Sequence, residues 1–588
     1  MARFLRGTVT ALDGGGGLHS AIGLQVQRVV FPRILIRFVL AGLLVPITLW
    51  ADLRFAEVAE DAGIAFRHVA SKTAEKYLVE AMGAGVATLD FDGDGLLDVY
   101  FVNGADLPKL KRGTPDAKSD RRYWNRLYRN TGDWRFVDVT EQAGVAGHGY
   151  GMGVAVADYD ADGDPDLFVS NFGPDALFRN EGNGSFREVS DDAGIEGTDW
   201  STGAAFLDFN GDGWLDLFVS RYLEWSFDES KPCGESLPER RSYCHPRVFA
   251  PARHALYRNL GDGRFEDVST ATGIAAHPGK GLGVAVNDFD DDGWIDIFVA
   301  NDSYPQQLFH NMAGKRFEEM AVTTGSAYDA EGREYAGMGV VWADYDRDLR
   351  PDLLVNALGR QGYWLYRNEG ARFEPVSDVS GLTALSELRS GWGMGLVDFD
   401  NDGWRDLIVG QGHVMDDIGL SDEALAHNEP LMLARNLFGR FYDVSRQAGA
   451  VFQRPFPARG IAFGDLDGDG RVDAAVNVND GPALVLRNVS NAGTGLTVRL
   501  VGTGRNRDAV GAIVQVKNGE GVEQRAFRGG GGSYLSATSP DIHFGLGESG
   551  LCEWITVRWP DGSTQTVTAP DDPLVVVRQA AHPEGQPN

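Results

Sequence analysis

The chain has 588 residues, of which 43% are hydrophobic and 23% charged, and a formal net charge of −30. A chain of this length can bury a large core and holds more than one domain. Strong acidity without a basic stripe argues against nucleic acid as a partner. The 76 glycines are dispersed over turn positions, which indicates a many-stranded fold rather than disorder.

Residues 1–51 differ from the rest of the chain. They carry five arginines and one aspartate, and an apolar run extends from Phe38 to Ala51. A basic stretch followed by a short apolar run predicts a signal peptide cleaved near Ala51. A membrane-spanning helix needs about 20 residues, so an uncleaved N-terminal anchor is the alternative. The long basic region also leaves open a translation start downstream of Met1. We expect a secreted, periplasmic or cell-surface protein, in contact with a membrane only if this segment is uncleaved.

An acidic loop recurs seven times after residue 89, and we number the copies loop 1 to loop 7. Each reads Asp-x-Asp/Asn-x-Asp, usually with Gly next, and a last Asp stands eight residues after the first. Such spacing turns side-chain oxygens at positions 1, 3, 5 and 9, and a backbone carbonyl at position 7, toward one cation. Oxygen ligands in a flexible loop favour Ca²⁺ over Mg²⁺.

The sequence therefore predicts up to seven Ca²⁺ ions, which would reduce the net charge from −30 to −16. Two loops depart from the pattern: Asn210 replaces an aspartate, and Leu349 stands where glycine is expected, which predicts a distorted site in loop 5. The predicted ligands at positions 1, 3, 5, 7 and 9 are Asp90, Asp92, Asp94, Leu96 and Asp98 (loop 1); Asp158, Asp160, Asp162, Asp164 and Asp166 (loop 2); Asp208, Asn210, Asp212, Trp214 and Asp216 (loop 3); Asp288, Asp290, Asp292, Trp294 and Asp296 (loop 4); Asp344, Asp346, Asp348, Arg350 and Asp352 (loop 5); Asp398, Asp400, Asp402, Trp404 and Asp406 (loop 6); and Asp465, Asp467, Asp469, Arg471 and Asp473 (loop 7).

The flanks of the loops repeat as well. A Gly-rich apolar strand precedes each loop, a second strand follows it, a third ends in Asn, and a fourth has the form Phe-x-x-Val. Four strands in each of seven units predict an all-β fold, a seven-bladed β-propeller over residues 52–489. The fourth-strand pattern also occurs at 55–58 and is missing after Asn488, so the N-terminal strand should complete the last blade. An open array of hairpins is the alternative, but it would leave two strand edges unpaired.

The insertion between loop 3 and Leu256 contains Cys233 and Cys244. Ten residues separate them in a polar, Pro- and Arg-bearing segment. For an exported protein this predicts a local disulfide, and a metal site with His245 is the weaker alternative. Cys552 is left over, and we expect it to be buried and inert.

The composition shifts after Asn488, where the acidic loops end. Alternating strands over residues 490–570 predict a small C-terminal β-domain, and residues 571–588 are expected to be a disordered tail. Four consecutive glycines at 529–532 lack the lysine and the helix of a phosphate-binding loop, so they predict a tight backbone crossing within this small domain.

Two groups of motifs resemble known families. The repeated units resemble the FG-GAP/VCBS repeats of integrin-α-like propellers. The resemblance lies in two segments, Gly-x-Gly-Val-Ala-x-x-Asp-x-Asp-x-Asp-Gly and Leu-Tyr-Arg-Asn. The stretches at 506–516, 532–547 and 557–562 resemble an ASPIC/UnbV domain. The combination, over residues 52–568, is similar to the cartilage-acidic-protein-like family. The resemblance implies an exported calcium-binding propeller with an adhesion or ligand-binding role, and both motifs are poor guides to activity.

No catalytic motif stands out, so an enzyme is less expected than a binding module. His413, near two acids, is the most suggestive histidine, but a hydrogen-bonded turn residue is the expected role. The tryptophans at position 7 could stack on sugars, and packing between blades is expected instead. We predict adhesion to, or binding of, an extracellular protein or glycan, with recognition through the insertions, chiefly 104–124 and 223–251, and through the C-terminal domain. The alternatives are a calcium-dependent extracellular hydrolase, which predicts a deep polar pocket on the propeller axis, and an accessory protein of specialised metabolism. The sequence does not fix an oligomeric state.

Overall fold

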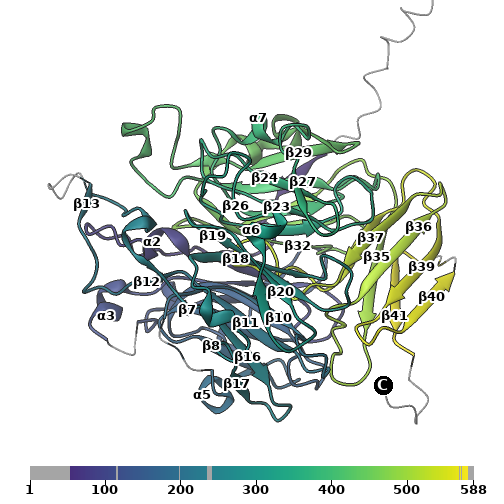
Figure 1. Ribbon diagram of the computed structural model, residues 1–588, viewed down its shortest axis with the longest axis horizontal. Coiled ribbons are helices and arrows are strands. Elements are labelled where there is room, and N and C mark those ends of the chain that lie inside the picture. The colour runs from purple at the N-terminus through teal and green to yellow at the C-terminus, as the bar shows by residue number, and fades with distance from the viewer. Residues whose placement is uncertain are drawn as a thin grey trace, which may run out of the picture. The chain divides into compact units, whose positions relative to one another are not determined.

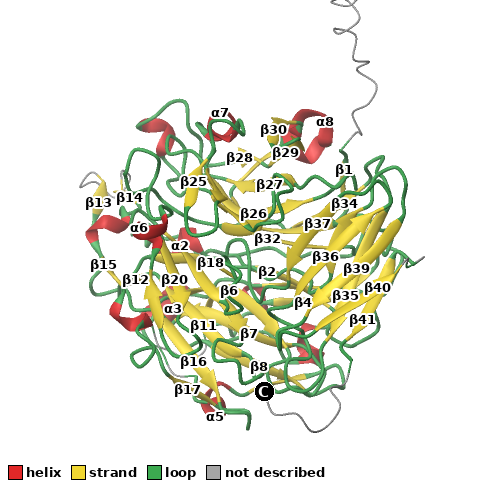
Figure 2. Cartoon of the chain, turned by 45° about the vertical axis from the view of Figure 1, so that its right-hand side comes forward, coloured by secondary structure: helices red, strands yellow, loops and turns green. Residues whose placement is uncertain are grey.

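A computed structural model describes residues 53–113, 117–195, 197, 199–234, 241–568, 570 and 572–580. The predicted signal peptide or anchor, residues 1–51, lies outside the described residues. Among the helices of the described ranges, none is long and apolar enough to cross a membrane. Strands dominate the described chain, and most of its helices are single turns (Figures 1 and 2).

Seven four-stranded antiparallel sheets, one for each acidic loop, fill residues 55–488. We number these blades after their loops. In order from the first strand to the fourth, they are blade 1, β2 (Val86–Leu89), β3 (Asp98–Phe101), β4 (Arg126–Asn130) and β5 (Phe136–Asp138); blade 2, β6 (Tyr150–Ala157), β7 (Asp166–Phe172), β8 (Ala176–Asn180) and β9 (Phe186–Glu188); blade 3, β10 (Ser201–Leu207), β11 (Asp216–Arg221), β16 (Ala255–Asn259) and β17 (Phe265–Asp267); blade 4, β18 (Gly281–Asn287), β19 (Asp296–Asn301), β20 (Gln307–Asn311) and β21 (Phe317–Glu319); blade 5, β22 (Val340–Ala343), β23 (Asp352–Val355), β24 (Trp364–Asn368) and β25 (Phe373–Pro375); blade 6, β26 (Gly391–Val397), β27 (Asp406–Gln411), β29 (Met432–Leu437) and β30 (Arg440–Asp443); and blade 7, β32 (Ala458–Gly464), β33 (Asp473–Val478), β34 (Leu484–Asn488) and β1 (Phe55–Glu57).

The first strands of the blades neighbour one another in a closed cycle, β2–β6–β10–β18–β22–β26–β32 and back to β2. The N-terminal strand β1 closes the ring, because it pairs antiparallel with β34 as the fourth strand of blade 7, with Phe55 opposite Asn488. The prediction of an all-β propeller is confirmed, and the closed cycle replaces the open array considered above.

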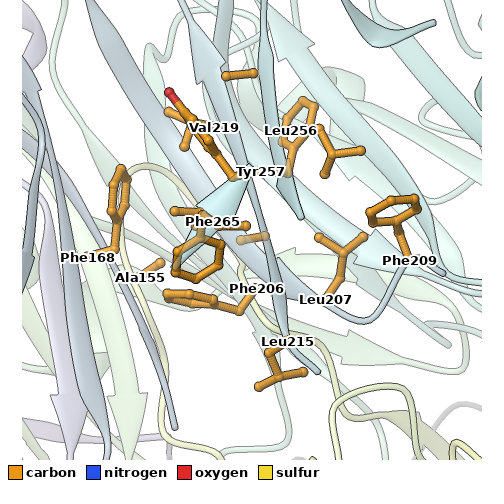
Figure 3. Close-up of a cluster of buried hydrophobic side chains, with 14 of the residues drawn as sticks. Ala155, Phe168, Phe206, Leu207, Phe209, Leu215, Val219, Leu256, Tyr257 and Phe265 are labelled. Atoms are coloured by element: carbon orange, nitrogen blue, oxygen red, sulfur yellow. The ribbon is translucent and has the colours of Figure 1, made fainter. Parts of the chain in front are cut away.

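Aromatic and aliphatic side chains fill the space between neighbouring blades. In the largest core cluster, Phe168, Phe206, Leu256 and Phe265 come from blades 2 and 3 and are all at most 5% exposed (Figure 3). Burial of each such side chain stabilises the fold by about 1.5–3 kcal/mol. Similar clusters recur between other blades, so the ring is held by hydrophobic packing as well as by hydrogen bonds.

Short helices and hairpins decorate the connections between strands. The helices are α2 (Val79–Met82), α3 (Leu107–Lys111), α4 (Thr140–Ala143), α5 (Ser190–Ala193), α6 (Ala321–Thr324), α7 (Leu382–Ser386) and α8 (Ser445–Ala448), with 3₁₀ turns at Arg121–Tyr123, Pro246–Val248, Ile274–Ala276, Ile418–Leu420 and Ala450–Gln453. The two-stranded sheets are β12 (Leu223–Glu224) with β15 (Ala250–Pro251), β13 (Cys233–Gly234) with β14 (Arg241–Ser242), and β28 (Glu429–Pro430) with β31 (Pro455–Phe456).

A disulfide joins Cys233 and Cys244 in the insertion of blade 3. Closing a loop of this size stabilises the fold by about 2–4 kcal/mol. The same insertion buries Trp225, Tyr243 and Phe249 in a cluster shared with α2. The disulfide therefore helps to hold an aromatic-rich segment against the propeller.

The C-terminal domain consists of two small sheets around its own core. One contains β38 (Ile542–Gly545), β35 (Gly495–Val501) and β41 (Leu574–Arg578), and the other contains β37 (Glu523–Phe527), β36 (Ile513–Asn518), β39 (Cys552–Arg558) and β40 (Thr564–Thr568). Strand β41 pairs parallel with β35 inside the predicted disordered tail, 571–588. That prediction is therefore corrected: the domain extends at least to Arg578. Cys552 is free and buried.

The glycine-rich segment of this domain enters the centre of the propeller. We call residues 529–541, between β37 and β38, the plug. The plug exchanges backbone hydrogen bonds with the first strands of blades 1, 2, 3, 5 and 7, such as that from the Phe206 N–H to the Gly530 carbonyl (3.1 Å), and Ser533 Oγ accepts one from the backbone of blade 6. Its tip, Tyr534, is fully buried and donates to the Met82 carbonyl at 2.5 Å.

The plug requires glycine where it passes the first strands. A Cβ on Gly530 would lie 1.7 Å from the Phe206 carbonyl oxygen, and one on Gly85 of blade 1 would lie 2.1 Å from the Leu535 carbonyl oxygen. The predicted tight backbone crossing exists, but it lies between the C-terminal domain and the propeller rather than within the small domain. The plug also occupies the axis, where the hydrolase alternative predicted a deep polar pocket.

Candidate metal centres

Each acidic loop is shaped by hydrogen bonds from its own backbone. In all seven loops a position-1 carboxylate oxygen accepts the N–H of position 6, as Asp90 does from Gly95 at 2.9 Å. In all seven the position-5 carboxylate accepts the N–H of position 7, as Asp94 does from Leu96 at 3.0 Å. Such side-chain turns fold the loop back on itself and bring its acids together.

The position-9 aspartates anchor the loops to the blades. Asp98 is 0% exposed, and its two carboxylate oxygens accept the N–H groups of Asn130 (2.7 Å) and Phe91 (3.0 Å). The same two bonds, from the Asn that ends the third strand and from position 2, recur in the other six loops. Position 9 thus joins the loop to the third strand of its own blade.

The Asn at the end of each third strand, or one residue before the end in blade 6, also links neighbouring blades. Asn180 of blade 2 donates through Nδ2 to the Phe91 carbonyl in loop 1, at 2.8 Å. Each of the other six makes the same bond to the preceding loop, and Asn130 of blade 1 reaches the Leu466 carbonyl in loop 7. Seven side-chain hydrogen bonds therefore run around the whole ring. The sequence identifies this Asn as a repeated position, but no local pattern indicates that it links neighbouring blades.

The carboxylates of a loop converge on one point. In loop 5 one oxygen each of Asp344, Asp346, Asp348 and Asp352 lie within 4.8 Å of one another, and three-residue groups of the same kind form in loops 1, 2 and 4. Ca²⁺ is held by oxygens at 2.3–2.6 Å, and oxygens on opposite sides of such an ion are roughly this far apart. The arrangement can therefore accommodate a small hard cation.

Several position-3 carboxylates have an oxygen that makes no hydrogen bond with a described residue and is therefore available to bind an ion. A buried oxygen of Asp92, Asp160, Asp346, Asp400 and Asp467 has no hydrogen-bond partner among the described residues. Buried polar atoms in native proteins are almost always partnered, because an unpaired one costs free energy. A cation at the convergence point would satisfy these oxygens, so the residues present fit Ca²⁺.

Burial raises the pKa of the loop acids. Desolvation, which outweighs two backbone hydrogen bonds, raises the pKa of Asp98 to about 8 and that of Asp352 to about 9. It also raises the pKa of Asp465 at position 1 to about 6, where the charges of Asp469 and Asp467 add to the effect. Without a cation, these loops hold protons or repelling charges near neutral pH.

Arginine side chains from the third strands form ion pairs with the loop acids in several blades. Arg129 lies 2.6 Å from Asp92, and Arg487 lies 2.9 Å from Asp467. Arg435 contacts Asp400 at 2.6 Å and Asp402 at 3.0 Å. These residues occupy one position of the Leu-Tyr-Arg-Asn motif. The recurring Arg before Asn was the signal that could have identified them.

The two irregular loops keep the common form. Leu349 of loop 5 takes a φ of 68° where other loops have glycine, and its N–H still reaches Asp344. The predicted distortion of this site is therefore wrong, since the loop accepts the unfavourable backbone conformation instead. In loop 3, Asn210 donates to Asp212 at 2.9 Å and accepts the N–H of the same residue.

The position-7 tryptophans and His413, the other candidate functional residues, make contacts that suit a structural role. The position-7 tryptophans pack against neighbouring segments: Arg347 of loop 5 lies 3.9 Å above the Trp404 ring, and Arg505 lies 5.1 Å above Trp214. His413 accepts the Met415 N–H at Nδ1, and burial lowers its pKa to about 4. This is the turn role expected for it.

Two family matches agree with this architecture. FG-GAP-like repeats match residues 90–169, 158–219, 248–299 and 288–355, and the ASPIC and UnbV family matches residues 502–582. The chain therefore contains FG-GAP-like repeats and a C-terminal ASPIC and UnbV domain.

Among curated proteins, it is similar to cartilage acidic protein 1. The identity is 26% with the protein from Xenopus tropicalis and 25% with that from Mus musculus, over 56% and 54% of this chain. The matches span 41% and 48% of those relatives, so the chain covers less than half of their length.

Solved structures give weaker likenesses. An Agrocybe aegerita lectin that recognises terminal N-acetylglucosamine has 16% identity and a TM-score of 0.35, over 61% of this chain and 79% of its own. Saccharomyces cerevisiae Sqt1 has 10% identity and a TM-score of 0.38, over 70% of this chain and 96% of its own.

Loss of a single loop ligand should be measurable. We expect Asp469→Ala to lower the unfolding temperature in calcium, because one occupied site contributes about 2.7 kcal/mol at one hundred times its Kd. The matched control is Asp262→Ala, which removes an exposed turn acid paired with Arg264 outside the loops. Differential scanning calorimetry in calcium checks the prediction. Equal melting of the Asp469 variant and the parent would show that loop 7 holds no ion.

Proposed function

We propose that the protein is an exported, calcium-binding propeller that acts as an adhesion or ligand-binding module. The observation that carries the proposal is the buried position-3 oxygen that has no hydrogen-bond partner among the described residues in five of the loops, three of which have converging acids. Calcium there would fix the turn between the first two strands of each blade. The ring would then be a rigid platform, and export would supply millimolar calcium.

The partner is an extracellular protein or glycan. The similarity to cartilage acidic protein 1, whose name places it in cartilage, supports this class of partner. Within the insertion 104–124, Trp124 is half-buried, with the guanidinium groups of Arg121 and Arg126 at 5.0 and 5.4 Å from its ring. Aromatic rings flanked by arginines suit protein contacts and stacking on sugars.

Binding to immobilised neutral glycans and to purified matrix proteins, with calcium and with a chelator, tests the proposal. We expect binding in calcium, its loss on chelation, and at least a tenfold weakening in Trp124→Ala, since interface aromatics are worth about 2 kcal/mol or more. The control Phe438→Ala removes an aromatic that is 82% exposed outside the insertions. Binding that persists in chelator, or none to either class of partner, would refute the proposal.

A further inference from the structure

A cavity of about 260 Å³ lies between the C-terminal domain and the propeller. It is lined by the ends of the first strands of blades 5, 6 and 7, by their acidic loops and by residues 525–529 and 538–543. One buried water needs roughly 10–15 Å³ on the same measure, so the space is large enough for an organic molecule. Neither domain alone encloses it.

The walls of this cavity are largely apolar. Trp342, Leu396 and Phe463 line it from the propeller, and Phe527 lines it from the C-terminal domain. Sites for small molecules combine such walls with a few polar groups that fix orientation. The class of ligand therefore depends on the few charged side chains in the walls that are not already paired with another described residue.

Arg405, next to the last acid of loop 6, lines the cavity without a partner. Its guanidinium makes no hydrogen bond or ion pair with any described residue, and Asp344 and Asp398 are the acids whose charges act on it. Those two acids hold position 1 of loops 5 and 6. If calcium takes them up, as proposed above, Arg405 is left without a counter-ion in a partly apolar space.

A second guanidinium, Arg528, lines the same cavity from the C-terminal domain. Arg528 is 9% exposed, its Nη1 donates to the Gly529 carbonyl, and its Nε has no hydrogen-bond partner in the part of the chain that the structure describes. The other charged groups that line the cavity outside the loops are already paired: Arg525 with Asp291, and Asp541 with Arg499 at 2.7 Å. Arg350 pairs with Asp348 within loop 5.

We propose that this cavity binds a small organic carboxylate with an apolar body, with the carboxylate held by Arg405 and Arg528. The planar guanidinium matches a carboxylate in two parallel hydrogen bonds, and the apolar walls take the ring or short chain. The site needs both domains, so it gives the pairing of a propeller with this C-terminal domain a function. The proposal goes beyond calcium binding and rests on it only for neutralisation of Asp344 and Asp398, the two acids whose charges act on Arg405.

Titration calorimetry of the full chain in calcium with 3-phenylpropionate, and with the uncharged 3-phenylpropionamide, provides the test. We expect the acid to bind and the amide to bind at least tenfold more weakly. Arg405→Gln should weaken acid binding by about 10- to 100-fold, the effect of lost charge-assisted hydrogen bonds, and Arg405→Lys should restore part of it. The control Arg258→Gln removes an exposed arginine paired with Glu266 and should bind the acid like the parent.

Equal binding of acid and amide, no binding of the acid, or an unchanged affinity in Arg405→Gln would each overturn the proposal. Binding of inorganic phosphate as tight as that of the acid would also overturn it, because the apolar walls would then contribute nothing. Melting of the same samples with and without calcium reports on the loops separately. A calcium-dependent melt without acid binding defeats only the cavity proposal, and acid binding with a calcium-independent melt defeats only the calcium proposal.

Discussion

Chelation of calcium is expected to lower the unfolding temperature by at least about 5–10 °C. Each occupied site stabilises the fold by about 2.7 kcal/mol at a calcium concentration one hundred times Kd, and seven loops contribute together. In loops 1, 2, 4 and 5, three or four ligand atoms lie within 4.8 Å of one another, so the carboxylate charges repel strongly when no cation is bound. Calorimetry in calcium and in a calcium chelator measures the difference.

The effect of calcium should grow with pH. In the metal-free protein the pKa of Asp98 is about 8 and that of Asp352 about 9, above the unfolded value of about 3.9. The folded state then binds more protons, so the stability from these groups is present below about pH 4 and is lost as the pH rises through 8 to 9. Calcium replaces those protons, so the difference in unfolding temperature should be larger at pH 8 than at pH 5.5.

Magnesium at the same concentration is the matched control, because it prefers a tighter octahedron and retains its waters. It should shift the melting far less than calcium does. A protein that melts at one temperature in calcium, magnesium and chelator would contradict metal binding by the loops, whatever its partner.

Substitution of a single plug glycine is expected to have the second large effect. In Gly530→Ala the new Cβ would lie 1.7 Å from the Phe206 carbonyl oxygen, a backbone atom that cannot move aside cheaply. Overpacking of this kind costs about 1–3 kcal/mol or more, and here it also strains the hydrogen bond from Phe206. We expect a lower unfolding temperature, or a plug displaced from the axis.

Gly529→Ala is the control for that experiment, because its Cβ would meet the Val286 carbonyl oxygen at an ordinary 3.4 Å. Thermal melting and limited proteolysis between β37 and β38 compare the two variants. If both behave like the parent, the plug does not occupy the axis in solution.

The repeated features were predictable because their signals are local. Each signal spans only a few residues. The spacing of the loops and the pattern of the strands predicted the blades, and the N-terminal Phe-x-x-Val at 55–58 predicted closure of the ring by β1. The C-terminal strand at 574–578 was missed, although four apolar residues in a row begin at Leu574. Nearby Pro and Gln favoured a frayed tail, and the parallel partner β35 lies more than seventy residues away.

Long-range contacts account for the other misses. The four glycines at 529–532 predicted a close crossing, but the carbonyl that requires Gly530 belongs to Phe206, over three hundred residues earlier. Asn130 likewise reaches Leu466 across 336 residues. A local sequence pattern cannot identify a partner so far away in the chain. The plug, the ring of Asn side chains and the cavity at Arg405 could therefore be found only from the structure.

The way β1 closes blade 7 determines how the protein responds to mechanical load. Phe55 stands opposite Asn488, and the Arg54 carbonyl accepts the N–H of Val489, so the chain enters and leaves this strand pair at the same end. Tension between the two emerging segments would peel the backbone bonds of β1 one after another instead of shearing them all at once. Buried Phe55, which packs against Phe399 and Phe452, then resists opening of the ring together with Leu53 of the same cluster.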